Sequence, residues 1–566
     1  MSSDEKKQKG LTRRDFVKGA AAGTVGGLVA GTAGAAMAAP KAQPKAGTPA
    51  KWNYTADIVI AGAGCAGLPA AVEAAERGAS VVVIDQNFDV GGYGLVSSGS
   101  ILTGGGTRQQ KEKGIEDSAD LRYRDLIDHR YSQTKKNDRA QARAFADLCV
   151  ETTEWLEKHG TKLIVNAKYF PQYTYGSVER GHCAVWTEED QTAKCPHTQM
   201  VWAGTTMRDV EVGENVSFIR STGAGFIRPL QEAAKKMKGI QFLMEHKLTR
   251  IIREKHLEGA VLGIEVVHKG KEICLKAQKG VIIAAGGPKG NVQLRRLWDP
   301  RLTEIYQASG EPWAFHTGEG IIEAQKIGAQ LTGDYGNDIH WLHARSSFGT
   351  RWHSTSGYIT KLRTGQDRTG FSVRNAQDVI HVNSEGKRFY NEMPTTWEKQ
   401  IPYCDAAMAN SGGPIWCIFD AEAVKREKWD PSFPTTEPGY FHKADTVAEL
   451  AAKIKVPVAA LEETISRYNS FVDQGQDPDF GKPSPKFKIQ AAPFYAAWAT
   501  PYLHDTRGGI RVNEKCQVLD VQAAVIPGLY AVGEAAGGLD LCGLAKAIVS
   551  GRIAARNAAG EKFRGL

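Results

Sequence analysis

The clearest hydrophobic pattern in the chain lies between Asp57 and Asp85, where two short apolar runs flank a glycine-rich turn and an alanine-rich segment. The first run is Ile58-Val59-Ile60, and the second extends from Val81 to Ile84. Short apolar runs bounded by turn residues are typical of buried parallel strands, and the alanine-rich segment between them is typical of a helix. The pattern predicts a β-α-β unit that ends on Asp85.

Further along the chain, the spacing of apolar residues alternates between helix and strand periods. Apolar positions three and four residues apart predict helices from about Asp117 to His159. Strands are predicted at four later runs, Ile240 to Met244, Leu248 to Ile252, Val261 to Val267 and Val281 to Ile283. The stretch from Tyr169 to Trp202 is rich in aromatic residues without clear periodicity, which predicts a long ordered loop; contact with a substrate or a redox partner is the alternative.

The turn after the first strand reads Gly62-Ala63-Gly64-Cys65-Ala66-Gly67, the dinucleotide fingerprint in its required strand-turn-helix context. Gly62 permits the tight turn, Gly64 lets the backbone approach a pyrophosphate, and Gly67 lets helix and strand pack closely. The helix N-terminus supplies N–H groups and a positive dipole to the phosphates. Asp85 closes the second strand, where a carboxylate can accept hydrogen bonds from the ribose hydroxyls. An ordinary βα turn is the alternative, and the register of all these elements argues against it.

A second glycine-rich loop follows directly, from Val90 to Ser100. Its small residues would let the backbone lie against a flat ring system. A surface turn is the alternative, which is less attractive because the loop comes straight after the predicted ribose-binding strand.

The length of 566 residues and the 42% hydrophobic composition allow a large core and predict two or three domains. At the N-terminus, Thr12-Arg13-Arg14-Asp15-Phe16-Val17-Lys18 precedes a weakly apolar Gly/Ala run and the small-x-small site Ala36-Met37-Ala38. This pattern predicts a twin-arginine signal peptide over residues 1–38, a linker over 39–50, and a mature protein in the periplasm. A membrane anchor is the alternative, but the run is too short and too polar to hold a bilayer.

The predicted signal carries six basic and three acidic residues, so the formal charge of +8 falls to about +5 on the mature chain. No cluster of basic residues interleaved with aromatics suggests nucleic acid. The nine cysteines include no C-x-x-C-H and no C-x-x-C, which argues against covalently attached c-type haem and a cysteine-ligated iron–sulfur cluster in this chain. Cys183 and Cys195 could form a disulfide, whereas a metal site with His182 and His197 is the weaker interpretation; we predict no metal.

Several blocks together resemble the flavoprotein family that includes soluble fumarate reductase, urocanate reductase and 3-ketosteroid Δ1-dehydrogenase. These blocks are the fingerprint, Ala284 to Gly287, Val382 to Glu392, Thr464 to Asn469 with Gly475 to Gly481, and Pro527 to Glu534. The resemblance implies an α/β fold in which two chain segments form a Rossmann-like FAD-binding domain around an inserted α+β capping domain. The expected bounds are 51–291 and 396–566 for the FAD-binding segments and 292–395 for the cap.

The resemblance also implies which residues contact FAD. These are the fingerprint and ribose residues Gly62, Ala63, Gly64, Ala66, Gly67 and Asp85, the loop residues Gly92, Tyr93, Gly94, Ser97, Ser98 and Gly99, and the later residues Leu248, Ala285, Gly286, Gly287, Gly533, Glu534, Ala547 and Ile548.

Family members move a hydride between flavin N5 and a carbon of a polarised C=C bond. Dicarboxylate-reducing relatives carry an arginine proton donor where this chain has Trp397, and a carboxylate-clamping arginine in a segment that here runs from Gly537 to Ile548 without arginine. Because guanidinium groups grip carboxylates with paired hydrogen bonds, these departures argue against fumarate and favour a bulky, weakly charged, aromatic or planar substrate.

Three residues are expected to act on the substrate. The family's H-x-T-x-G-G motif begins here at His504, and the family's cap histidine corresponds to His340. His504 would hydrogen-bond a substrate carbonyl or carboxylate, with His340 opposite it. Arg507 is a candidate replacement cation. Each of these three residues has a structural or surface role as its alternative.

The leading hypothesis is an exported reductase of an activated C=C bond in anaerobic respiration, with electrons from a separate c-type cytochrome or quinol dehydrogenase. A dehydrogenase that desaturates a ring ketone or oxidises an alcohol is the second hypothesis, which requires a tyrosine base such as Tyr93, Tyr390 or Tyr495. A flavin electron carrier without substrate turnover is the third. The twin-arginine translocase is an expected partner, and no stable membrane anchor is expected.

Overall fold

The computed structural model describes residues 48–97, 99–128, 137–165, 176–185, 209–210, 219–220, 223–298, 300–306, 308, 314–332, 342–345, 376–393, 414–429, 431, 439–500, 502–506, 508–539, 541 and 543–560. The predicted signal peptide and most of the predicted linker lie outside these ranges and stay predictions. Across these ranges, no helix combines the length and the apolar composition that crossing a membrane would require.

The main sheet has eight strands, five of which are parallel in the order β21-β11-β1-β2-β8. Their bounds are β1 Tyr54–Ala61, β2 Val81–Ile84, β8 Ile240–Leu243, β11 Lys271–Ile283 and β21 Val525–Ala531. The antiparallel strands are β9 Lys247–Lys255, β10 Glu258–His268 and β20 Gln517–Leu519. The predicted strands are confirmed. Because parallel strands share a direction, the loops after β1, β2, β11 and β21 meet at one edge, where α/β sheets bind ligands.

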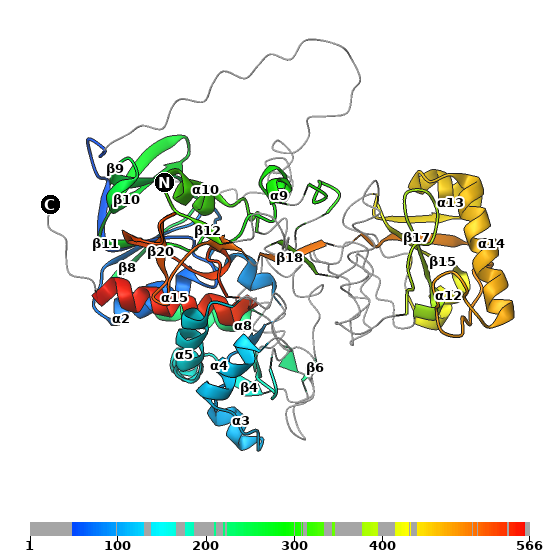
Figure 1. Cartoon of the computed structure of the whole chain (residues 1–566), viewed down its shortest axis with the longest axis horizontal. Helices are drawn as coiled ribbons and strands as arrows, with labels where there is room; N and C mark the ends of the chain where they lie inside the picture. Colours follow the sequence, from blue (N-terminus) through cyan, green and yellow to red (C-terminus); the bar gives the residue numbers. More distant parts are fainter. Residues whose placement is uncertain are drawn as a thin grey trace, which may run out of the picture. The chain divides into compact units, whose positions relative to one another are not determined.

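Side chains of β1 alternate between the two faces of this sheet, so each face has its own core. Ile58 and Ile60 pack with the helices α2 Gly67–Glu76, α5 Arg139–Lys158, α8 Ala224–Lys236 and α15 Gly543–Gly560. Val59 and Ala61 pack on the other face with β9, β10 and α10 Glu319–Lys326. Figure 1 shows α2 and α15 on one face of the sheet, and β9, β10 and α10 on the other.

A smaller sheet, ordered β3-β5-β4, lies among helices α3 Arg108–Glu112, α4 Ala119–Ile127 and α5. Its strands are β3 Ser100–Leu102, β4 Leu163–Val165 and β5 Gly181–Ala184. The helices predicted up to His159 are confirmed. The prediction of a continuous loop from Tyr169 to Trp202 is wrong at β5, because this segment pairs with strands on both sides.

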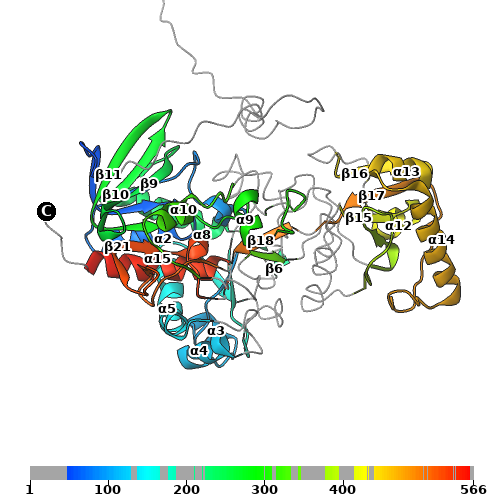
Figure 2. The same cartoon turned by 45° about the horizontal axis from the view of Figure 1, so that its top comes forward.

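A separate antiparallel sheet, ordered β14-β15-β17-β16, is formed by β14 Ile380–Val382, β15 Trp416–Phe419, β16 Phe441–Ala444 and β17 Phe494–Trp498. Helix α12 Ala421–Glu427 packs on one face, and α13 Val447–Ile454 and α14 Val458–Gln474 pack on the other (Figure 2). The expected domain boundary at residue 395 falls between β14 and β15, which are hydrogen-bonded partners, and the domain bounds stay a prediction.

A buried group of charges holds this second sheet together. The Arg388 guanidinium donates to both carboxylate oxygens of Glu392 at 2.9 and 2.8 Å and to Asp477 Oδ2 at 2.9 Å. Lys482 Nζ lies 3.4 Å from Glu392 Oε2 and donates to the carbonyl of Val379 at 2.7 Å. We call Arg388, Glu392, Asp477 and Lys482 the buried ion cluster. It joins two of the blocks that carry the family resemblance.

Candidate active site

The fingerprint turn adopts the geometry that its glycines permit. Gly62 has φ +109°, and a Cβ on Gly67 would lie 1.8 Å from the carbonyl oxygen of Gly62, so only glycine fits there. A Cβ on Gly64 would meet nothing closer than the carbonyl oxygen of Gly91 at 3.9 Å. The N-terminus of α2 has no side-chain cap and no acidic residue in its first turn. The turn therefore leaves open space and N–H groups where a pyrophosphate would bind.

Asp85 fixes this turn through main-chain hydrogen bonds. Its carboxylate accepts the N–H of Ala63 at 2.7 Å and the N–H of Asn87 at 2.8 Å. Burial raises the pKa of Asp85, although these two hydrogen bonds act in the opposite direction. Each carboxylate oxygen keeps a second lone pair that can accept a hydrogen bond from a ribose hydroxyl. The contact of Asp85 with ribose stays a prediction.

The second glycine-rich loop packs against the fingerprint. Gly64 and Gly91 form a parallel bridge, and the N–H of Gly91 donates to the carbonyl of Ala63 at 2.9 Å. The loop then forms a short 3-10 helix, Gly92–Val96, where the sequence predicted no regular element. A Cβ on Gly94 would lie 2.9 Å from the Cβ of Cys65, so glycine allows the close approach.

The loops after β11 and β21 reach the same edge of the main sheet. Gly286 has φ +77° and Gly533 has φ +63°, and a Cβ on Gly533 would lie 3.0 Å from the Cβ of Ala66 in the fingerprint. A Cβ on Gly287 would lie 2.2 Å from Thr506 Oγ1. The Thr506 side chain is buried, and its hydroxyl has no hydrogen-bond partner among the residues that the structure describes. A buried hydroxyl of this kind fits a site that holds a polar ligand.

Most of the remaining predicted FAD contacts also surround this edge. Ala547 and Ile548 are buried in the first part of α15, Ala285 follows β11, and Gly99 has φ +68° just before β3. The Ser97 carbonyl accepts the N–H of Gly223 at 3.0 Å. Leu248 lies in β9 with its side chain in the core, so that only its backbone is available for a cofactor. Ser98 lies outside the described residues.

Two predicted FAD contacts, Tyr93 and Glu534, lie close to Lys289, a residue that the sequence analysis did not select. Lys289 is buried, and its Nζ lies 3.7 Å from the centre of the Tyr93 ring and 3.9 Å from Glu534 Oε2. The signal for Lys289 was its position just after the Ala284-to-Gly287 block, at the end of a strand already assigned to the cofactor edge. Thr506 was missed although it belongs to the H-x-T-x-G-G motif.

These observations satisfy the requirements of a dinucleotide cofactor, and Gly64 provides a test. We expect Gly64→Ala to weaken FAD binding at least about tenfold, or about 1.4 kcal/mol, because the methyl group fits the protein but occupies the pyrophosphate space. The stability of the apoprotein should hardly change, since the Cβ meets nothing closer than 3.9 Å. FAD titration and urea unfolding of the apoprotein would measure the two effects.

Gly560→Ala is the matched control, because a Cβ there has no neighbour within 4 Å at the far end of α15. Gly67→Ala should instead destabilise the fold, since its Cβ would collide with a backbone oxygen. Unchanged FAD affinity in Gly64→Ala, or an unfolded apoprotein, would contradict the assignment.

Of the three candidate catalytic residues, His504 lies in β18 Tyr502–Thr506, which forms an antiparallel ribbon with β13 Leu342–Arg345. Asp505 pairs with His343 and Leu503 pairs with Ala344, so His504 is the extra residue of a β-bulge. Bulges are common next to active sites, where they redirect a side chain. His340 and Arg507 lie outside the described residues, and their roles stay predictions.

His182 and Cys183 lie in β5, where the sequence suggested a disulfide or, less favourably, a metal site. Both ring nitrogens of His182 have partners, with Nε2 2.8 Å from Thr107 Oγ1 and Nδ1 3.0 Å from the carbonyl oxygen of Arg180. His182 therefore has no nitrogen left to bind a metal. Cys195 and His197 lie outside the described residues, so the disulfide with Cys183 stays a prediction.

Burial lowers the pKa of His182 to about 4, which predicts acid destabilisation. Between pH 6.5 and 4 the unfolded chain binds this proton and the folded chain does not, so the free energy of unfolding falls as the pH falls. Comparing urea unfolding at about pH 6.5 and about pH 5, we expect His182→Gln to remove up to about 2 kcal/mol of that pH dependence.

The exposed His256, in the turn between β9 and β10, supplies the control variant His256→Gln. Equal pH dependence in the wild-type protein and in His182→Gln would show that His182 does not titrate in this way.

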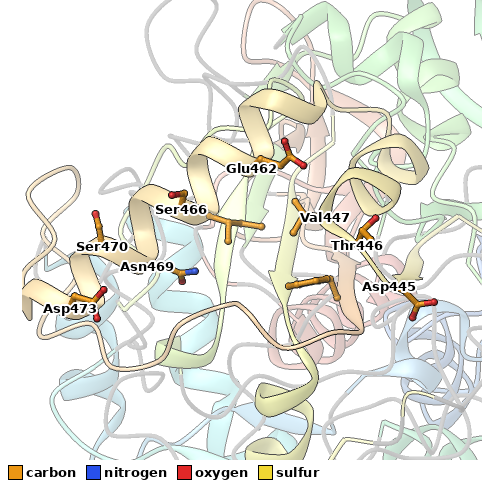
Figure 3. Close-up of a pocket in the computed structure, with 10 residues that line it drawn as sticks. Asp445, Thr446, Val447, Glu462, Ser466, Asn469, Ser470 and Asp473 are labelled. Carbon is orange, nitrogen blue, oxygen red and sulfur yellow. The ribbon is translucent and has the colours of Figure 1, made fainter.

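A pocket lies beside the antiparallel sheet β14-β15-β17-β16, and none of the predicted site residues lines it. Figure 3 shows it between α13 and α14, with Asp445, Glu462, Ser466 and Asp473 among its lining residues. Two of its polar residues serve the local structure. Thr446 accepts the N–H of Glu449 at the start of α13, and Asn469 exchanges hydrogen bonds with the backbone of Ile489. We therefore assign it no catalytic role.

Comparison with known proteins agrees with this cofactor site. The sequence matches the FAD binding domain family over residues 57–543. It is 28% identical over 512 residues to a probable fumarate reductase of Shewanella frigidimarina, covering 89% of this chain and 75% of that protein. It is 29% identical over 573 residues to the acrylate reductase flavoprotein subunit of Shewanella woodyi, covering 96% of this chain and 98% of that protein.

A solved structure supports the same assignment. The open conformation of a flavocytochrome c3 fumarate reductase superimposes with a TM-score of 0.66 at 25% identity, covering 98% of this chain and 83% of that one. The chain therefore belongs to the FAD binding domain family, and it is an FAD-dependent oxidoreductase.

Proposed function

We propose that the protein reduces an activated C=C bond of a bulky, weakly charged substrate, aromatic or otherwise planar. Bound FAD would supply the hydride, and the chain's own residues would orient the substrate and deliver the proton to the neighbouring carbon. The relatives named as fumarate and acrylate reductases support the reaction class, since both names describe reduction of a C=C bond.

The contact between Thr506 and Gly287 carries this proposal. It brings the H-x-T-x-G-G segment against the loop after β11, at the edge where the fingerprint also lies. His504 is two residues before Thr506, at the bulge of β18. A histidine placed there would hydrogen-bond the electron-withdrawing group of the substrate and stabilise the charge that develops as the hydride arrives.

The distribution of arginines supports a substrate that is not a dicarboxylate. No arginine occurs from Gly537 to Ile548. The next one, Arg552, is buried and committed to Glu73 at 2.8 Å and Thr152 at 2.8 Å. It is therefore not available to clamp a substrate carboxylate. Trp397, which stands where such relatives have an arginine, lies outside the described residues.

The capping domain would exclude water from the reaction. We place it from about residue 333 to about residue 499, because α10 packs on the main sheet, β12 Leu331–Thr332 pairs with β19 Gly509–Ile510, and the second sheet ends with β17 at Trp498. The FAD-binding domain would then comprise residues 51 to about 332 and about 500–566, since β18 and β19 lead back to β20 and β21.

The twin-arginine pattern supports export to the periplasm, and the absence of any haem-attachment motif in the sequence supports a separate electron donor. We propose a c-type cytochrome or a quinol dehydrogenase in this role.

The alternative dehydrogenase needs a tyrosine that ionises readily. Tyr495 does not fit, because burial raises its pKa and it stacks with Phe419 and Phe441.

Anaerobic reoxidation of the flavin tests the function. The purified holoprotein is reduced with dithionite, and enones, aryl-acrylates, acrylate and fumarate are added one at a time while the flavin absorbance is followed. We expect rapid reoxidation by a planar, weakly charged acceptor and slow reoxidation by fumarate. Fastest reoxidation by fumarate would refute the substrate class. Reoxidation only by oxygen or dyes would refute the reductase itself.

A further inference from the structure

A buried lysine lies at the cofactor edge, beside a carboxylate and an aromatic ring. Lys289 is 0% exposed. Its Nζ is 3.9 Å from Glu534 Oε2 and lies over the ring of Tyr93 at 3.7 Å from the ring centre. Removing an ammonium group from water is costly unless negative charge or π-electron density surrounds it. Glu534 and Tyr93 supply these two kinds of partner, so Lys289 can stay charged in its buried position.

The backbone of Lys289 is held firmly by a second buried cation. Arg295, from α9 Val292–Trp298, donates to the carbonyl of Lys289 at 2.7 Å. The same guanidinium donates to the carbonyls of Leu302 at 2.9 Å and Tyr306 at 2.7 Å, and also to that of Thr303. All of these acceptors are backbone groups, so Arg295 fixes the loop after β11 and with it the origin of the Lys289 side chain.

The groups around Lys289 come from loops at the cofactor edge. Tyr93 follows β2, Glu534 follows β21, and His316 precedes α10. His316 Nδ1 lies 3.7 Å from Glu534 Oε2, and its ring meets that of Tyr93 edge to face. The pKa of the Cys65 thiol in the fingerprint is raised to about 12, by burial first and then by the charge of Glu534, while the charge of Lys289 opposes the shift.

We propose that Lys289 stabilises the negative charge that FAD gains on reduction and so raises its midpoint potential. When a flavin takes up two electrons and one proton, the ring system keeps one negative charge. The electrons come from the protein's electron donor and the proton comes from solvent. A buried cation at the cofactor edge favours the reduced form over the oxidised form because the low local dielectric strengthens its attraction to that charge. The inference rests on FAD binding and not on the identity of the substrate.

The test compares the affinities of oxidised and reduced FAD. Apoprotein is titrated anaerobically with FAD and with dithionite-reduced FAD, so that the ratio of the two dissociation constants is obtained even when a variant binds weakly. We expect Lys289→Met to lower the preference for reduced FAD about tenfold, equivalent to about a 30 mV fall in the two-electron midpoint potential. Lys289→Arg should keep most of the preference, since it keeps the charge.

Lys326→Met is the matched control, because Lys326 is an exposed lysine on α10 that pairs with Glu323. Its ratio should equal that of the wild-type protein. A change of less than twofold in Lys289→Met, or an equal change in Lys326→Met, would overturn the proposal. So would a loss of preference in Lys289→Arg as large as that in Lys289→Met, since the charge would then not be the cause. None of these readouts depends on substrate reduction, so the failure of this proposal and that of the proposed reductase activity are distinguishable.

Discussion

Replacing His504 with alanine is expected to lower kcat at least about a hundredfold, while FAD remains bound. His504 occupies the bulge of β18, and the same strand brings Thr506 against Gly287 at the cofactor edge. A hydrogen bond to the substrate's electron-withdrawing group matters most when hydride transfer places charge there. The loss should therefore appear in kcat more than in KM. The measurement is stopped-flow reoxidation of the reduced flavin by the acceptor that reacts fastest with the wild-type protein.

Two further readouts separate this role from a structural one. The rate of flavin reduction by dithionite should be unchanged in His504→Ala, because that step does not involve the substrate. His256→Ala, at an exposed turn, should leave both rates unchanged. A reoxidation rate within a few-fold of wild type would remove His504 from the mechanism, and loss of the flavin spectrum would assign it to the fold instead.

The β-α-β unit that forms the cofactor site could be predicted because local sequence spacing determines its strands, turn and helix. The spacing from Ile58 to Asp85 specifies a strand, a turn, a helix and a second strand, and a Cβ on Gly67 would collide with Gly62. Such constraints act within about thirty residues, so they can be read without knowing the rest of the fold. The helices around α5 were predictable for the same reason.

Features that depend on distant segments were not predictable in this way. The strand β5 is short and has no alternating pattern, and its pairing with β3 and β4 is what makes it a strand. β14 pairs with β15 across more than thirty residues of sequence, so this pairing could not inform the predicted domain boundary. Thr506 belongs to a motif and Lys289 follows a recognised block, but the sequence does not show that these two segments meet at one edge of the sheet.

The buried ion cluster of the second sheet leads to the other large expected effect, on stability. Arg388 is 8% exposed, and both of its carboxylate partners, Glu392 and Asp477, are buried more completely. Removing the guanidinium in Arg388→Met would leave two carboxylates buried beside the single ammonium of Lys482. Because an uncompensated buried charge costs far more than a surface pair contributes, we expect a loss of about 3–5 kcal/mol in the free energy of unfolding. Urea unfolding, monitored by tryptophan fluorescence, would measure it.

The control and the pH dependence both come from the same module. Arg467 pairs with Asp479 at the surface, where water screens the pair, so Arg467→Met should cost far less stability than Arg388→Met. Burial raises the pKa of Glu392, but the charges of Lys482 and Arg388 outweigh it and hold the pKa at about 2. The stability that Glu392 contributes is therefore complete above its ordinary pKa of 4.5 and is lost as the pH falls toward 2. Arg388→Met should lose this stability at a higher pH than the wild-type protein, because its Glu392 holds a proton more readily. If Arg388→Met were no less stable than Arg467→Met, the cluster would contribute nothing to the fold.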